Sequence, residues 1–69
     1  MTHDFSHAAM HRIADWPVLA GIAARHTTAK RLDSRAVAAL YARAQDSDWQ
    51  AMTPVERTFA DAALAAFPT

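Results

Sequence analysis

The stretch TPVERTFADAALAAF, residues 53–67, carries the strongest local signal for secondary structure in the chain. Thr53 and Glu56 have the spacing of a capping box, in which each side chain bonds a backbone N–H group at the start of a helix. Pro54 suits the first helical position, where its missing N–H group costs nothing. The sequence therefore predicts a helix that begins after Thr53. The residues expected on the inner face of this helix are Val55, Phe59, Ala62, Ala63 and Ala66.

Apolar side chains that recur every three or four residues predict further helices upstream of this stretch. The first is expected to begin at Thr2 or Asp4 and to end at Asp15, because Pro17 disfavours helix in the residue before it. A second helix is expected to start with Pro17 in its first turn and to end near residues 25–28.

A third helix is expected after an N-cap at Asp33 or Ser34. It should end at residues 46–48, Asp-Ser-Asp, because short polar side chains compete for backbone hydrogen bonds. Trp49 and Met52 then belong to a short turn that folds back over the core as a lid.

Strand signals, which are alternating runs of β-branched and aromatic residues between turns, are missing from the sequence. We therefore expect an all-α fold, a small bundle of three main helices plus a short helical turn, in a single domain spanning residues 1–69. The predicted core consists of Phe5, Ile13, Trp16, Val18, Leu19, Ile22, Val37, Leu40, Tyr41, Trp49, Met52, Val55 and Phe59.

This core is thin, because alanine occurs 18 times and the larger apolar residues also number only 18. Chains below about 70–80 residues usually need disulfides, a metal or an oligomer for stability. Cysteine is absent, which excludes disulfides and thiolate metal sites. We therefore expect a homodimer. It would use Met10 and Leu64, which lie off the predicted apolar stripes, or the small side chains of Ala20, Gly21 and Ala24.

The sequence contains no apolar run as long as a membrane-spanning helix, which needs about 18 residues or more. The first 12 residues, MTHDFSHAAMHR, also lack the apolar segment of a signal peptide. A cytoplasmic location is the resulting expectation.

Three histidines, His3, His7 and His11, follow one another at the i,i+4 spacing of a helix. On the first predicted helix they would form one ridge, and two such histidines can bind Zn²⁺, Ni²⁺ or Cu²⁺. No Cys/His framework or HExxH motif accompanies them. The simpler interpretation is a solvated polar face, so we expect no metal or other cofactor and keep the three histidines as weak candidates.

The charges are segregated, although seven basic and seven acidic residues cancel over the whole chain. Residues 25–43 carry a net charge of +4, and the remainder carries −4. Arginine holds carboxylates bidentately and stacks on aromatic rings, which makes it common at interface hot spots. This pattern predicts an interface with an acidic protein surface, unless the arginines are merely solvated. Its candidate residues are Arg31, Arg35, Arg43, Tyr41 and Leu64.

Equipment for catalysis is not visible, because the sequence has no Gly-rich phosphate loop and no distinguished carboxylate pair. We predict a non-enzymatic helical module that binds a larger protein and regulates or inhibits it. Small phage and plasmid proteins that antagonise a host regulator or ATPase share these general features. Two alternatives stay open. One is a DNA-binding regulator that uses residues 25–43, although the connection between the second and third predicted helices is long for a helix–turn–helix. The other is a metal-binding accessory subunit that uses the N-terminal histidines.

Overall fold

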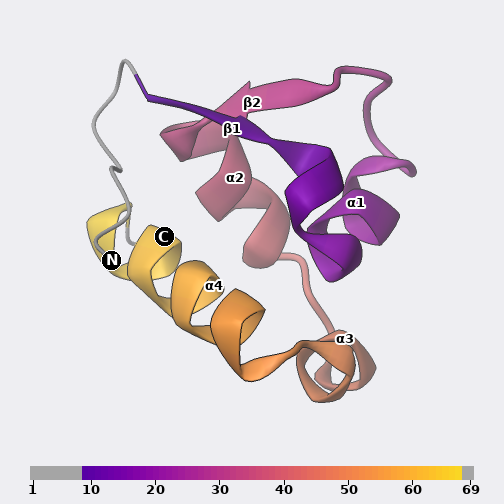
Figure 1. The fold of residues 1–69 in the computed structure, drawn as a ribbon, viewed down its shortest axis with the longest axis vertical. Helices are drawn as coiled ribbons and strands as arrows, with labels where there is room; N and C mark the ends of the chain where they lie inside the picture. Colours follow the sequence, from indigo (N-terminus) through magenta and orange to yellow (C-terminus); the bar gives the residue numbers. More distant parts are fainter. Residues whose placement is uncertain (1–8, 68–69) are drawn as a thin grey trace.

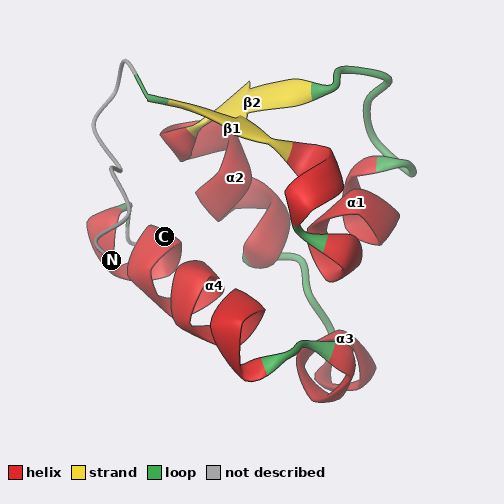
Figure 2. Ribbon diagram, viewed as in Figure 1, coloured by secondary structure: helices red, strands yellow, loops and turns green. Residues whose placement is uncertain are grey.

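The computed structural model describes residues 9–67 of the chain. Its elements, in chain order, are β1 (Met10–Arg12), the 3-10 helix η1 (Ile13–Asp15), α1 (Pro17–Ala23), β2 (Arg31–Asp33), α2 (Ser34–Tyr41), α3 (Asp46–Ala51) and α4 (Pro54–Ala66). Most of this part is helical, and the two strands form a small antiparallel ribbon (Figure 2). Helix α2 lies at the centre and contacts α1, α4 and both strands (Figure 1).

The first predicted helix is wrong over residues 10–12, which form β1 instead. In the antiparallel pairing with β2, His11 stands opposite Leu32 and Arg12 opposite Arg31. The first pair is half-buried and the second is exposed, which is the two-residue alternation of a strand. Three residues are too few for this alternation to be recognised in a sequence. The all-α expectation is therefore corrected to a mostly helical fold with a two-stranded ribbon.

The remainder of that predicted helix divides into two parts. Residues 2–8, which include the predicted core residue Phe5, lie outside the described residues. Residues 13–15 form η1, a single 3-10 turn that buries Ile13. The backbone N–H of Ile13 donates to the carbonyl of Lys30 at 3.1 Å, so this turn continues directly from the ribbon.

Helix α1 begins as predicted, with Trp16 at the N-cap and Pro17 in the first turn. It buries the predicted core residues Leu19 and Ile22 together with Ala23, whereas the predicted core residue Val18 is half-buried. It ends at Ala23, slightly earlier than expected. The opposite face stays open within the described residues, because a Cβ atom added to Gly21 would meet nothing within 4 Å.

The N-cap of α2 is Asp33, as predicted, and its Oδ1 accepts a hydrogen bond from the N–H of Ala36 at 2.8 Å. The end of α2 differs from the prediction, because the helix stops at Tyr41 rather than at residues 46–48. Those acidic residues instead begin α3, where carboxylates in a first turn are favoured by the helix dipole. Asp48 also accepts a hydrogen bond from the backbone N–H of Gln45 at 2.9 Å.

The aromatic part of the core is built around Phe59 of α4, which is fully buried. The ring of Trp16 stacks on it, with centroids 3.8 Å apart and planes at 3°. The ring of Tyr41 meets it edge-on at 6.0 Å. Met52 is buried and Trp49 half-buried against the core, so the predicted lid is confirmed, although Trp49 belongs to a short helix. The remaining buried apolar residues are Ile13, Leu19, Ile22, Ala23, Val37, Ala38, Leu40, Ala60 and Ala63.

The inner face of α4 is rotated relative to the prediction. Its buried residues are Glu56, Phe59, Ala60 and Ala63, whereas Val55 is 65% exposed. The prediction treated Val55 as a core residue and Glu56 as a capping-box residue, whereas the structure exposes Val55 and buries Glu56. No helix within residues 9–67 combines the length and apolar character required to cross a membrane.

The cap of α4 provides the first prediction. Thr53 Oγ1 accepts a hydrogen bond from the N–H of Glu56 at 3.1 Å. Replacing Thr53 with alanine removes this bond and should lower the free energy of unfolding by about 1 kcal/mol. Urea denaturation followed by circular dichroism measures the change.

Thr58→Ala is the matched control in the same helix. The Thr58 hydroxyl donates to the carbonyl of Pro54 at 3.0 Å, one turn earlier, and the helix does not depend on this bond. Alanine is also the better helix former, so no loss of stability is expected. Equal losses in the two variants would show that the cap does not stabilise the start of α4.

Candidate functional site

The carboxylate of Glu56 is the buried charged group of the described residues, with 1% of the residue exposed. Its Oε1 accepts a hydrogen bond from the backbone N–H of Val18 at 3.1 Å. Its Oε2 accepts from the N–H of Leu19 at 2.9 Å and from the hydroxyl of Tyr41 at 2.9 Å. One side chain of α4 therefore connects the first turn of α1 to the last residue of α2.

The sequence prediction for Glu56 is half right. The Thr53 part of the capping box is present, but the Glu56 side chain does not turn back to its own helix start. It lies on the same helical face as Phe59, Ala60 and Ala63, and that spacing could have revealed its burial. Because the N–H groups of a first helical turn are unsatisfied and carry partial positive charge, they are suitable partners for a buried carboxylate. The contacts give Glu56 a structural role.

Tyr41 was predicted to contact a partner protein, and this prediction is wrong. The residue is 1% exposed, and its hydroxyl is bound to Glu56 inside the core. The alternative sequence prediction, which placed Tyr41 in the core, is confirmed. The predicted interface therefore loses its aromatic member.

His11 does not lie on a helical ridge, because residues 10–12 form a strand. Its Nε2 is 2.9 Å from Ser34 Oγ, and its ring meets Phe59 edge-on at 5.4 Å. Its ring therefore belongs to the packing between the ribbon and α4. His3 and His7 lie outside the described residues. Within residues 9–67, no group of three or more metal-ligating side chains comes together.

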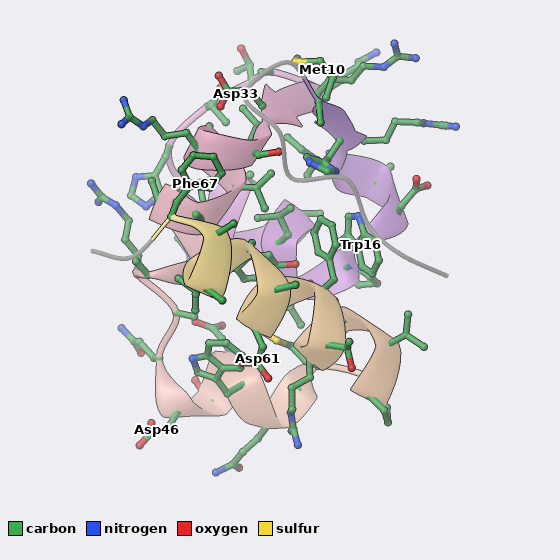
Figure 3. The ribbon with its side chains drawn as sticks, turned by 90° about the vertical axis from the view of Figure 1, so that its left-hand side faces the viewer. Met10, Trp16, Asp33, Asp46, Asp61 and Phe67 are labelled. Atoms are coloured by element: carbon green, nitrogen blue, oxygen red, sulfur yellow. The ribbon has the colours of Figure 1, made fainter. Side chains whose placement is uncertain are left out.

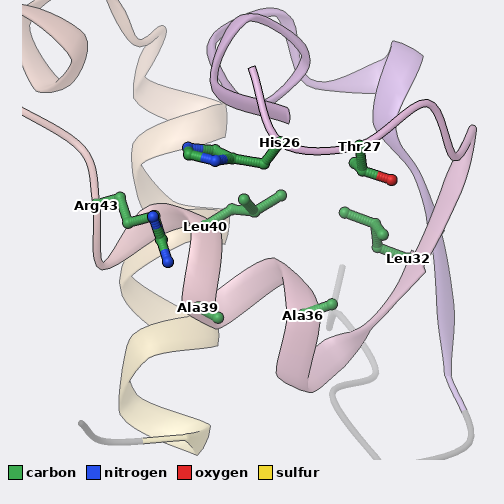
Figure 4. A pocket seen from close by; sticks show the side chains of 7 residues that line it. All are labelled: His26, Thr27, Leu32, Ala36, Ala39, Leu40 and Arg43. Carbon is green, nitrogen blue, oxygen red and sulfur yellow. The ribbon is translucent and has the colours of Figure 1, made fainter. Parts of the chain in front are cut away.

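The outer face of α2 borders an open groove of about 420 Å³, which we call the α2 groove. Leu32 of β2 and the loop after α1 form its other side. Figure 4 shows Arg43, Ala39 and Ala36 along the α2 side of the groove, His26 and Thr27 on the loop across from them, and Leu32 at the end next to Ala36. The lining residues are His26, Thr27, Leu32, Ala36, Ala39, Leu40 and Arg43.

The loop beside the α2 groove is held locally. Thr27 Oγ1 accepts a hydrogen bond from the N–H of Ala29 at 3.0 Å, and the N–H of Thr27 donates to the carbonyl of Ala23 at 2.8 Å. The loop therefore gives the groove a defined wall.

The three arginines predicted to share an interface are distributed over different elements. Arg43 follows α2 and lines the α2 groove. Arg31 lies on β2, on the strand face opposite to Leu32, and therefore points away from that groove. Arg35 is exposed in the first turn of α2 and lines neither cavity described for the molecule. Arg31 and Arg35 do not share a helical face, because Arg31 belongs to β2 and precedes the helix.

A second cavity, of about 460 Å³, lies where the ribbon meets α1, and we call it the cationic pocket. Arg31 lines it together with two further cations that the sequence analysis did not single out, Arg12 and Lys30. Their separation by some 18 positions hides the cluster in the sequence, and only the pairing of β1 with β2 brings it together. The complete lining is Arg12, Ile13, Ala14, Ala20, Ala29, Lys30 and Arg31.

Leu64 was predicted to project from the outer side of α4 as a spare contact residue. It is half-buried and packs against the core, so less of it is available than expected. The exposed large apolar side chains of the described part are instead Met10, with 59% exposed, and Val55. Met10 lies at the ribbon end of the molecule, away from Asp46 and Asp61 at the other end (Figure 3).

No family model, curated protein or solved structure matches this chain. The geometry of the described residues is therefore the basis of the functional argument.

The contact between Tyr41 and Glu56 predicts a loss of stability at alkaline pH. Burial raises the pKa of Tyr41 far above its ordinary value, and the hydrogen bond to Glu56 and the negative charge of Glu56 raise it further. Above about pH 10 the unfolded chain loses the tyrosine proton, whereas the folded protein keeps it. The free energy of unfolding should therefore fall as the pH rises, by up to about 1.4 kcal/mol per pH unit.

Urea unfolding at several values between about pH 9 and pH 11 measures this slope. Tyr41 is the single tyrosine of the chain, so its absorbance also reports the ionisation directly. Tyr41→Phe removes the titrating group and should make the stability less dependent on pH over this window. An unchanged slope in that variant would assign the alkaline loss to other groups.

Proposed function

We propose that this protein is a small non-enzymatic binding module that holds a larger protein through the α2 groove and thereby regulates or inhibits it. The observation that carries the proposal is an apolar helical face with an arginine at its end. Ala36, Ala39, Leu40 and Arg43 are spaced i, i+3, i+4 and i+7, and they line one open groove. This is the spacing with which a helix presents one face to another helix.

The chemistry of the groove favours an acidic amphipathic helix as its occupant. The alanines allow a partner helix to approach closely, and the half-buried Leu32 offers an apolar surface for a side chain such as leucine. Arg43 is exposed, and its side chain has no hydrogen-bond or ion-pair partner within residues 9–67. Its guanidinium can hold a carboxylate of the partner in bidentate geometry.

The alternatives have less support. DNA binding was considered because two helices flank the basic segment, but residues 24–33 separate α1 from α2 and include strand β2. That arrangement differs from a helix–turn–helix, whose helices are joined by three or four residues. For catalysis, the described part offers one buried carboxylate, Glu56, and its partners are two backbone N–H groups and a tyrosine hydroxyl.

The homodimer stays a prediction. Leu64 no longer favours it, but Met10, Val55 and the open small face around Gly21 are available for self-association. A dimer through any of these would leave the α2 groove accessible, because none of the three lines that groove.

The test of the proposed function is affinity capture from an extract of the cell that encodes the protein, with quantitative mass spectrometry. Ala39→Glu and Arg43→Glu place negative charge on the floor and at the end of the groove, at exposed positions where the fold should tolerate it. We expect a captured protein with an acidic helix whose recovery falls roughly tenfold or more in both variants.

Two control variants test whether the loss of recovery is specific to the α2 groove. Ala65→Glu makes the same substitution at an exposed alanine of α4, and Arg12→Glu reverses a charge on the ribbon, outside the groove. Both should capture the partner as the unchanged protein does. Recovery that is equal in all four variants, with unchanged circular dichroism, would place the partner surface elsewhere.

A further inference from the structure

The outward face of the β1–β2 ribbon places two arginines side by side. Arg12 and Arg31 are directly opposed in the antiparallel register, and both are exposed. Opposed residues have Cβ atoms about 4.5–5.5 Å apart, and like charges in such positions destabilise the pairing. Lys30, the neighbour of Arg31, adds a third positive charge to the same pocket.

The described part of the chain pairs none of these three charges with a carboxylate. Within residues 9–67, none of the three side chains has a hydrogen-bond or ion-pair partner. The nearest carboxylate along β2 belongs to Asp33, which accepts the N–H of Ala36 as the cap of α2. Among the described residues the cluster therefore has no direct counterion, and it can attract an anion from solution.

The cluster also borders a half-open, partly apolar depression in the surface. The cationic pocket has a volume of about 460 Å³, within the range of about 300–1,000 Å³ found for small-molecule sites. Its apolar lining comes from Ile13, Ala14, Ala20 and Ala29. Three of these four side chains are single methyl groups, which makes the lining suitable for a flat ring rather than for a branched chain.

We propose that the cationic pocket binds a free phosphate-bearing small molecule with a flat aromatic body, the class to which nucleotides belong. Two guanidinium groups and an ammonium match a phosphate group of charge about −2 better than a single carboxylate. The aromatic body rests on the alanine lining while the phosphates face Arg12, Arg31 and Lys30. This site shares no lining residue with the α2 groove, so ligand binding in the pocket and partner binding in the groove are tested separately.

Isothermal titration calorimetry with ADP tests the proposal, with adenosine and inorganic phosphate as the two halves of the ligand. ADP should bind saturably and at least tenfold more tightly than either half. The double variant Arg12→Gln/Arg31→Gln should weaken ADP binding at least tenfold, and higher salt should weaken binding to the unchanged protein. Arg43→Gln, which removes a positive charge from the α2 groove, is the matched control and should leave the affinity unchanged.

Several results would overturn the proposal. These are no saturable ADP binding, inorganic phosphate binding as tightly as ADP, or equal weakening by Arg43→Gln, which would indicate general charge attraction. A single-stranded oligonucleotide that binds more tightly than ADP would assign the pocket to a nucleic acid strand instead. Circular dichroism and thermal unfolding of the double variant ensure that loss of binding is not loss of fold, since both substitutions are at exposed positions.

Discussion

The carboxylate of Glu56 is the constraint on which the arrangement of the helices depends. Transfer of a charge from water into a protein interior costs several kcal/mol, so a buried carboxylate persists only with good partners. Here the partners are the N–H groups of Val18 and Leu19 and the hydroxyl of Tyr41. Each partner belongs to a helix other than α4, so satisfying the charge requires α1, α2 and α4 to meet at one point.

Helix α1 depends on this arrangement for its stability. It has seven residues, too few for a helix to be stable alone in water. Its first-turn N–H groups, which have no acceptor within the helix, receive the carboxylate. The burial of Leu19, Ile22 and Ala23 then holds the helix against the core. A fixed α1 in turn fixes the loop that follows it and the return of the chain to β2.

The positions of the two proposed binding surfaces follow from which side chains the core buries. Helix α2 buries Val37, Ala38 and Tyr41 in the interior, so its other side, with Ala39, remains open, and Arg43 follows just after the helix. The ribbon turns His11 and Leu32 inward, so Arg12 and Arg31 face outward. One surface is apolar with an arginine at its end, and the other is a cluster of positive charge. These chemistries suit different ligands.

The sequence predicted the parts of the fold that depend on local signals. Residues close together in the chain determine the caps at Thr53 and Asp33 and the start of α1 at Pro17. They also indicated the burial of Leu19 and Ile22. The ribbon could not be predicted, because each strand has three residues and its partner is about 20 positions away. The burial of Glu56 was missed because residue type argued against it, and only the positions of α1 and Tyr41 provide its partners.

The same contrast applies to the candidate sites. The basic segment of residues 25–43 was recognisable from composition, but its division into two surfaces was not. Arg31 and Arg43 face different cavities because strand alternation and helix periodicity place them differently. Arg12, which completes the cationic pocket, lies outside the basic segment and joins it through strand pairing alone.

Native-state hydrogen exchange of the Val18 and Leu19 amides, measured by NMR, tests the central role of Glu56 most directly. Amides in the first turn of a helix normally exchange fast because they lack an acceptor. We expect slow exchange at Leu19 and Val18, and loss of that protection in Glu56→Gln. The amide of Arg35 is the reference, because Arg35 is the second residue of α2, as Val18 is of α1, and it has no such acceptor in the described residues. Exchange at Leu19 as fast as at Arg35 in the unchanged protein would contradict the account.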